Sequence, residues 1–334
     1  MARRPRPSGI ADVAARAGVS VTTVSHSLSG RRPVAEATRQ RVAEAIAELG
    51  YQPNELARSM RSQRTNTVAL IVPDITNPFY TSVARGLLDV LTPASYVGIV
   101  CNTDADPELE QKIVQQMITR RVDGIAFSGY YEHHDDVAPA VAAGIPTVML
   151  GHHSPAPGVD VVNSDDHASG ADATRYLLGK GHRKIGFITA PAGSGAPAER
   201  VRGYQTALSE FGVPLNNNLV VRAPVGRDGG AEGMRALLDQ DEPPTAVICT
   251  NDIVAIGALD TARERGLQVP DDVAVMGFDD IEAARLITPQ LTTMAYAPRE
   301  IGQAVATILL NRIDGAPATH HRRRGARLMV RESA

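Results

Sequence analysis

The segment GVSVTTVSHSLSG, residues 18–30, gathers four serines, two threonines and one histidine in thirteen positions. Hydroxyl and imidazole groups are the donors and acceptors with which side chains contact base edges and phosphate oxygens. Gly18 can take the positive φ of a sharp turn, and Ser20 is a good cap for a following helix. The segment therefore predicts a turn and a short helix rich in hydrogen-bonding groups.

The flanking residues predict two further helices that hold this one in place. Residues 10–17 and residues 36–49 each place their apolar side chains on one helical face. In the middle helix, Val24 and Leu28 are one turn apart, and we expect both to pack inward. The outer side of that helix then carries four side chains: Val21, Thr22, Ser25 and His26. Such a unit fits a helix-turn-helix DNA reader, although helical stripes alone also occur in small packing modules.

The formal charge is divided between the two ends of the chain. Residues 1–65 contain 11 arginines and 5 acidic residues, a charge of +6, whereas the remainder holds 23 basic and 32 acidic residues, a charge of −9. A basic amino-terminal part on an acidic body suits phosphate binding at one end only. DNA contact is therefore expected from the first 65 residues.

Composition describes a soluble, multi-domain chain. Its 334 residues suffice for two or three domains, and no apolar run reaches about 18 residues, so no membrane span is expected. MARRPRPSG, residues 1–9, lacks the apolar core of a secretion signal and reads as a basic arm. Cys101 and Cys249 lie in apolar runs and fit buried thiols of a reducing cytoplasm better than a disulfide.

From Thr67 onward, apolar runs alternate with amphipathic helices. Seven runs are typical of parallel strands covered on both faces: TVALIVPD, YVGIVCNT, VDGIAFSG, PTVMLG, KIGFITA, AVICTND and VAVMGFDD. This alternation predicts doubly wound α/β sheets, which bind ligands at the carboxyl ends of their strands. The chain has neither a phosphate-binding loop nor a G-x-G-x-x-G after a first strand, so no cofactor is expected.

The chain resembles the lactose-repressor/galactose-repressor (LacI/GalR) family of bacterial transcriptional regulators. The resemblance is carried by IADVAARAGVSVTTVSHSLSG, by TRQRVAEAIAELGYQPNELARSMRS and by the terminal LMVRES. It implies a small all-α helix-turn-helix domain and an α/β periplasmic-binding-protein-like (type I) body. Such a body consists of two doubly wound parallel-sheet subdomains with a cleft between them.

The resemblance also implies a division of the chain. The expected parts are a basic arm (1–7), a helix-turn-helix domain (8–52), a hinge helix (53–65) and an effector-binding and dimerisation domain (66–334). Within that domain, one subdomain would comprise about 66–162 and 294–315, and the other about 163–293 and 316–334. The chain would cross between subdomains near Asn163, Thr293 and Gly315.

In this family the second helix lies in the major groove, and residues at its start read base edges. Val21 would make apolar contact, Thr22 a hydrogen bond or a methyl contact, and His26 would donate to guanine. Thr23 and Ser25 would hold phosphates.

The hinge is expected to order only when paired with its twin over DNA, because isolated short helices are unstable in water. By resemblance, Met60 would insert between base pairs in the minor groove. Arg58, Arg61 and Arg64 would contact phosphates; the alternative for the three is a solvated linker.

Polar residues follow several of the predicted strands, where the cleft is expected. Arg200 matches the family's cleft arginine, which can clamp two ligand oxygens. The other expected contacts with the effector are Asp74, Asn77, Phe79, Tyr80, Asn251, Asp252 and Asp279. Structural roles remain open for Asn77 as a turn residue and for Asp252 and Asp279 as helix caps.

The ligand class is less specified than the DNA-binding part. Val225 stands where many relatives carry a stacking aromatic, and Ser194 where purine-binding members carry a second arginine, which argues against a purine. A sugar or sugar-like polyol is the expected effector. The vicinal pairs His133–His134 and His152–His153 lack the spacing of helical metal ligands, so no metal site is expected.

The leading hypothesis is a cytoplasmic, homodimeric regulator, most simply a repressor, that binds a pseudo-palindromic operator in double-stranded DNA. A small effector in the cleft would control it. The last residues of the sequence show no heptad pattern, so a coiled-coil tetramer is not expected. The alternatives are a solute-binding protein or enzyme on the same body, for which no catalytic set is found, and a regulator without an effector.

Overall fold

The computed structural model divides the chain into two compact units, residues 1–65 and residues 66–334. The structure describes residues 8–29, 32–52, 64–129, 137–151, 157–191, 195–318, 320–322 and 326–334. The expected basic arm and almost all of the expected hinge helix lie outside them.

The first unit is a three-helix bundle. Its helices are α1 (Ile10–Ala17), α2 (Val21–Ser29) and α3 (Glu36–Leu49). Gly18 ends α1 with a φ of 64°, and Ser20 caps α2 by accepting a hydrogen bond from the backbone N–H of Thr23 at 3.1 Å. The core of the unit is formed by Val13, Ala14, Ala17, Val24, Val42 and Ala45.

The expectation that Leu28 packs inward is wrong. Its side chain is 42% exposed, whereas Val24, one turn earlier, is fully buried. Leu28 lies in the last turn of α2 and is not part of the cluster that holds the three helices together. Apolar spacing predicted the buried face of this helix but not how far along the helix burial extends.

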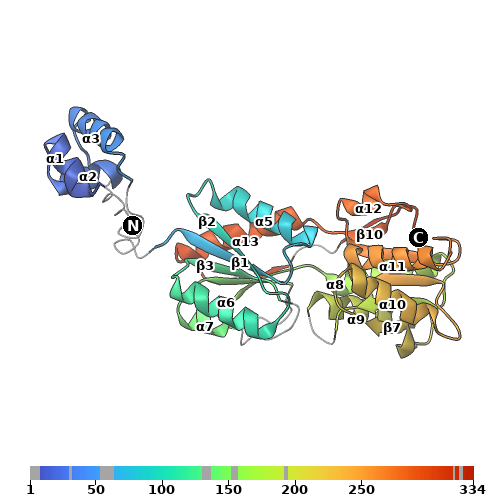
Figure 1. The fold of residues 1–334 in the computed structure, drawn as a ribbon. Coiled ribbons are helices and arrows are strands. Elements are labelled where there is room, and N and C mark those ends of the chain that lie inside the picture. The colour runs from blue at the N-terminus through green and yellow to red at the C-terminus, as the bar shows by residue number, and fades with distance from the viewer. Residues whose placement is uncertain are drawn as a thin grey trace. The chain divides into compact units, whose positions relative to one another are not determined.

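The second unit contains two six-stranded sheets, as the alternation of strands and helices predicted. The first sheet has the order β11-β5-β4-β3-β1-β2, and all its strand pairs are parallel. Its strands are β1 (Thr67–Val72), β2 (Val97–Asn102), β3 (Gly124–Phe127), β4 (Thr147–Leu150), β5 (Asp160–Asn163) and β11 (His320–Arg322). Helices cover both of its faces: α5 (Pro78–Leu91) and α13 (Pro298–Ile313) on one, α6 (Pro107–Thr119) and α7 (Ala138–Ala142) on the other (Figure 1). We call this sheet and its helices the first lobe.

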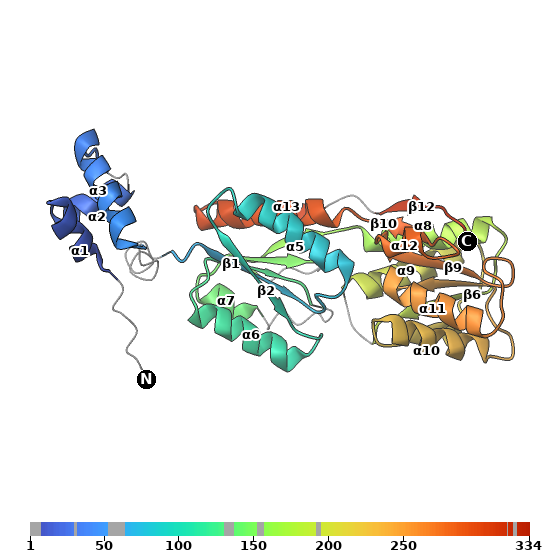
Figure 2. The same ribbon diagram turned by 45° about the horizontal axis from the view of Figure 1, so that its top comes forward.

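The second sheet has the order β12-β10-β9-β8-β6-β7. Only β12 runs antiparallel to its neighbour. Its strands are β6 (Ile185–Thr189), β7 (Val220–Arg222), β8 (Ala246–Cys249), β9 (Ala274–Asp279), β10 (Thr292–Ala295) and β12 (Arg327–Met329). The pair α8 (Asp166–Gly179) and α9 (Ala196–Glu210) covers one face, and the pair α10 (Arg227–Leu238) and α11 (Asp252–Glu264) covers the other (Figure 2). The single turn α12 (Ala283–Leu286) follows β9, and together these elements form the second lobe.

The chain passes between the lobes at three places. The first crossing follows Asn163 at the end of β5, and the second follows Ala295 at the end of β10. The third was expected near Gly315, but β11 pairs with β5 of the first sheet, so this crossing follows Arg322 instead. The first lobe therefore includes residues 320–322, which were expected in the second subdomain, because a three-residue edge strand has too little apolar patterning to be recognised.

Glycines set the close packing of the helix pairs. A Cβ on Gly170 of α8 would lie 2.2 Å from the backbone oxygen of Arg200 on α9, and one on Gly203 of α9 would lie 2.0 Å from that of His167. These contacts leave no room for any side chain, so the two helices touch backbone to backbone. No helix of the described part of the chain is long and apolar enough to cross a membrane.

Candidate functional site

The outer side of α2 is open to solvent in the first unit. Val21 is 45% exposed, and Thr22 is also exposed, whereas Ser25 and His26 are half-buried. The hydroxyl of Thr23 lies 2.9 Å from that of Ser20, so this threonine completes the cap at the start of the helix. An apolar group, hydroxyls and an imidazole thus share one short accessible helix. The other expected DNA contacts, Arg58, Met60 and Arg61, fall outside the described residues.

A cavity lies where the carboxyl ends of strands from both sheets meet. Its lining includes residues at or after the ends of β1, β3, β4 and β5 of the first lobe and of β6, β7, β8 and β9 of the second. It encloses about 790 Å³ of empty space, including the part open to solvent.

Six of the eight expected effector residues line this cavity: Asn77, Phe79, Tyr80, Arg200, Asn251 and Asp279. The two aromatic rings are in edge contact, with centroids 5.3 Å apart, and the Tyr80 hydroxyl lies 3.4 Å from that of Ser128. One wall of the cavity is therefore aromatic, which suits the apolar face of a sugar ring or another flat ligand.

The other two expected residues, Asp74 and Asp252, do not line the cavity. Asp74 accepts hydrogen bonds from the backbone N–H and the hydroxyl of Thr76 and so shapes the loop before α5. Asp252 is fully buried behind the cavity, where it accepts from the backbone N–H of Ile281 at 2.9 Å and from the hydroxyl of Thr293 at 2.5 Å. The cap of α11 is Asn251, not Asp252.

Two asparagines cap helices that follow strands, one in each lobe. Asn77 caps α5 by accepting from the backbone N–H of Phe79 at 3.0 Å, and Asn251 caps α11 by accepting from that of Val254 at 2.9 Å. These bonds use the side-chain oxygen, while each Nδ2 carries two further donors. The structural and the ligand-binding interpretations of these asparagines are therefore compatible.

Arg200 is held rigidly at the centre of the second-lobe wall. Its side chain is 10% exposed; Nε donates to Oδ1 of Asp166 at 2.9 Å and Nη1 to the backbone oxygen of Thr250 at 2.5 Å. The guanidinium also stacks over the rings of Phe278 and Tyr296, at 4.6 and 5.1 Å from their centroids. An arginine fixed on two sides keeps its remaining donors in a defined orientation.

Asp166 and Tyr296 line the cavity but were not among the expected residues. The Tyr296 hydroxyl donates to Oδ1 of Asp166 at 2.6 Å, the same oxygen that Arg200 contacts. Burial raises the pKa of Tyr296 well above its ordinary value, so the hydroxyl keeps its proton. Their signal in the sequence is weak: each lies within three residues of the end of a strand at which the chain changes lobe, and only the three-dimensional fold reveals this change.

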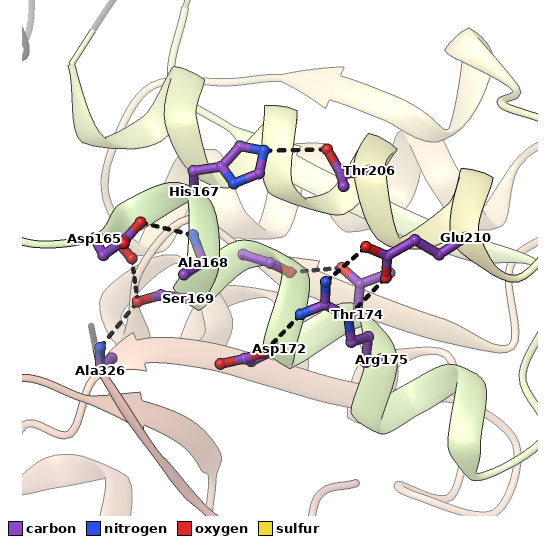
Figure 3. A network of polar contacts seen from close by, with 11 residues as sticks. Asp165, His167, Ala168, Ser169, Asp172, Thr174, Arg175, Thr206, Glu210 and Ala326 are labelled. Carbon is purple, nitrogen blue, oxygen red and sulfur yellow. Dashed lines mark hydrogen bonds and ion pairs between the residues drawn. The ribbon is translucent and has the colours of Figure 1, made fainter. Parts of the chain in front are cut away.

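Ser169 brings two of the interlobe crossings together, as Figure 3 shows. Its hydroxyl donates to the backbone oxygen of Asp165, on the first crossing, at 2.7 Å, and accepts from the backbone N–H of Ala326, on the third, at 2.9 Å. The second crossing reaches the same helix through Tyr296 and Asp166. The first turn of α8 is therefore bonded to all three connections between the lobes.

Asp279 presents a carboxyl group at the end of β9. The residue is 8% exposed and has a φ of 109°, a backbone conformation that residues other than glycine rarely adopt. Burial raises the pKa of Asp279 to about 7, with Arg200 acting to lower it and Asp166 to raise it. This carboxyl group therefore gains or loses its proton near neutral pH.

Thr250 supplies a hydroxyl that the protein itself does not use. Its Oγ1 is buried in the cavity wall and has no hydrogen-bond partner in the described structure. An unpaired buried hydroxyl costs free energy, and a ligand oxygen can satisfy it. In the described part of the chain, no group of three or more His, Cys, Asp or Glu side chains could hold a metal ion.

Comparison with known families matches both units. Residues 9–54 match the model of bacterial regulatory proteins of the lacI family, and residues 174–334 match that of a periplasmic binding protein-like domain. The HTH-type transcriptional regulator DegA of Bacillus subtilis (strain 168) is 35% identical over 296 residues, 88% of each chain. The chain belongs to the lacI family of bacterial regulatory proteins.

Other similar proteins agree in function and fold. The HTH-type transcriptional repressor CytR of Escherichia coli (strain K12) is 33% identical over 318 residues, which cover 95% of this chain and 92% of CytR. The solved structure of the transcriptional regulator CelR in complex with cellobiose has a TM-score of 0.74 at 33% identity and covers 98% of this chain and 100% of CelR. This lacI-family chain is accordingly a transcriptional regulator with a helix-turn-helix domain, and not an enzyme.

Proposed function

We propose that this regulator is a repressor that binds a pseudo-palindromic operator as a homodimer and is controlled by a sugar or sugar-like polyol. The observation that carries the proposal is the cavity, whose lining is drawn from both lobes and combines an aromatic wall with fixed hydrogen-bonding groups. Such a site suits a ligand with several hydroxyls and one apolar face. The cellobiose bound by CelR is a ligand of this kind.

The first unit supports the DNA-binding part of the proposal. It holds a charge of +6 in 65 residues, and its helix α2 leaves Val21 and Thr22 exposed beside His26. We assign Val21, Thr22 and His26 to base edges and Thr23 and Ser25 to phosphates. Two copies of such a reader fit two half-sites related by two-fold symmetry, which is why a homodimer and a pseudo-palindromic operator are proposed together.

The contacts of the cavity wall support control by a ligand. Arg200 and Asp166 line the cavity, and the first turn of α8, where Asp166 lies, is bonded to the three interlobe crossings. A ligand that contacts both lobes favours one arrangement of them, and can shift the equilibrium only by its difference in affinity for the two arrangements. We propose that the change in lobe arrangement alters how three hinge residues contact DNA: Met60 in the minor groove, and Arg58 and Arg61 at phosphates.

The proposal can be tested in two stages. A thermal-shift screen of the full chain against mono- and disaccharides and polyols, with ribose and cellobiose included, should reveal ligands that raise the melting temperature, because binding to the folded state stabilises it. Selection from random DNA duplexes should then yield a two-fold symmetric site. A screen without any hit would favour a regulator without an effector, and an asymmetric site would contradict the homodimer.

A further inference from the structure

We propose that the cavity accepts uncharged effectors and excludes anionic ones, because Asp166 neutralises the arginine that an anion would need. This inference rests on the proposed function and narrows it: a free sugar or polyol fits the site, whereas its phosphorylated or carboxylated form does not. Asp166 is in this view the residue that determines the charge of the ligand.

Arg200 is the one basic side chain among the described residues that line the cavity. Its charge is already paired with Asp166, whose side chain is 3% exposed, across 2.9 Å. A second donor, Nη1, is bound to the backbone oxygen of Thr250. Arg200 can therefore offer hydrogen bonds to a ligand, but its positive charge is compensated inside the protein.

The remaining charged group of the described lining is a carboxyl group. Asp279 lies in the cavity wall, close enough to Arg200 and Asp166 for their charges to act on its pKa. The wall thus combines one cation with two acidic groups. Burying a phosphate or carboxylate there would place further negative charge beside them, and the described lining offers no cation that is not already paired, so the lost hydration of the anion would not be compensated.

A neutral polyol meets none of this cost. Its hydroxyls can donate to Asp279 and accept from the remaining Arg200 donors, and one of its oxygens can pair with the buried Thr250 hydroxyl that lacks a partner. Each of these is a hydrogen bond to a group that is already fixed in place, so little ordering is required on binding. The same wall that repels an anion is complementary to a hydroxylated, uncharged ligand.

The test uses inorganic phosphate as the probe and the full chain as the protein. Isothermal titration calorimetry at constant ionic strength is carried out on the wild type, on Asp166→Asn and on Asp172→Asn. Asn keeps an oxygen that can accept from Tyr296 and Arg200, but it removes the negative charge. Asp172 lies on the same helix, pairs with the exposed Arg175 at 2.8 Å and does not line the cavity, so its variant is the matched control (Figure 3).

We expect Asp166→Asn to bind phosphate at least about tenfold more tightly than the wild type, a difference of about 1.4 kcal/mol. Asp172→Asn should bind like the wild type, and Arg200→Gln added to Asp166→Asn should remove the gain. Any phosphate held by the basic first unit is common to all variants and cancels in the comparison.

Equal phosphate affinity of Asp166→Asn and the wild type would overturn the proposal. So would wild-type binding that is lost in Arg200→Gln, because Arg200 would then serve an anion in its native state. If Asp166→Asn does not fold, Asp279→Asn takes its place, with a gain expected for the same reason. No sugar enters this experiment, so its outcome is independent of whether the thermal-shift screen finds an effector.

Discussion

The carboxyl group of Asp279 reaches the cavity on a backbone conformation that is costly for any residue other than glycine. Its φ is 109°, and Asp280, which follows, has a φ of 55°. Asp280 is held by ion pairs with Arg285 and Arg331. Such backbone outliers are found where the surrounding structure over-determines them, often at binding sites. The position of Asp279 therefore supports a role in ligand contact rather than in helix capping.

The protonation of Asp279 predicts a pH-dependent stability. Its pKa is about 7 in the folded chain because of burial, against an ordinary value of 3.8. The folded state therefore binds a proton that the unfolded chain releases, and the resulting stabilisation is full below about pH 4 and is lost as the pH rises to about 7. The loss amounts to up to about 4 kcal/mol.

Asp279→Asn removes this titration and keeps a side chain that tolerates a positive φ. Between pH 4 and pH 7 the free energy of unfolding of the wild type should fall relative to that of the variant, as measured by urea denaturation at several pH values. Parallel pH profiles for the two proteins would show that Asp279 does not carry a raised pKa.

Residue types alone could not separate ligand contacts from structural roles. Asn251 and Asp252 are neighbours at the end of one strand, yet only Asn251 reaches the cavity, while Asp252 is fully buried against Ile281 and Thr293. The sequence places both in the same loop. Which one faces the ligand depends on the phase of the first turn of α11 and on a loop that is remote in the chain.

At the scale of elements, the contact between α8 and α9 determines the distance between Asp166 and Arg200. The backbone of Gly170 lies against that of Arg200. The spacing of the two helices at this point therefore determines the distance between the side chains of Asp166 and Arg200. A larger residue at position 170 would push the helices apart and move Arg200 within the cavity wall.

Gly170→Ala should therefore lower the free energy of unfolding by about 2 kcal/mol or more, since overpacking forces the backbone to move. Gly179→Ala is the matched control on the same helix, because a Cβ there would meet nothing within 4 Å. It should leave stability unchanged or raise it by up to about 1 kcal/mol. Denaturant melts of both variants measure these changes in the free energy of unfolding. Equal effects of the two substitutions would refute the role of the close contact.

The hydrogen bond between Tyr296 and Asp166 joins two interlobe crossings. Tyr296→Phe keeps the ring beneath Arg200 but removes this bond. We expect the effect of a bound sugar on operator affinity to shrink by about 1.5 kcal/mol, in line with the loss of one hydrogen bond to a charged group. Fluorescence anisotropy titrations of labelled operator, with and without sugar, measure this coupling.

Tyr176→Phe is the control for that experiment. The Tyr176 hydroxyl donates to the backbone oxygen of Ala334 at 2.9 Å, in the second lobe and apart from the crossings. Its variant should keep the full coupling. If Tyr296→Phe also keeps it, the crossings are not linked to the cavity through Asp166.

At the scale of the whole molecule, the sequence was most informative where one signal repeats along the chain. Seven long apolar runs predicted strands β1, β2, β3, β4, β6, β8 and β9, and with them the doubly wound sheets. The other five strands have three or four residues each and all include polar or charged residues, so no apolar run marked them in the sequence. The third crossing was misplaced because it follows one of these strands, β11.

The cavity was predicted in outline for the same reason. Residues at the carboxyl ends of the recognised strands, such as Asn77, Asn251 and Asp279, were identified as cavity candidates. Asp166 and Tyr296 were not, because their importance comes from the crossings and from their shared contact with Arg200. Interactions between residues 130 positions apart leave no local pattern in a sequence.

We propose that a sugar-like ligand in the cavity changes the affinity of the chain for its operator. The most direct measurement is the dissociation constant of the selected operator with and without a saturating concentration of a sugar that raises the melting temperature. We expect at least about a tenfold change, and an equal change in sugar affinity when operator is bound, because coupling between two sites is reciprocal. An operator affinity that no stabilising sugar alters would contradict it.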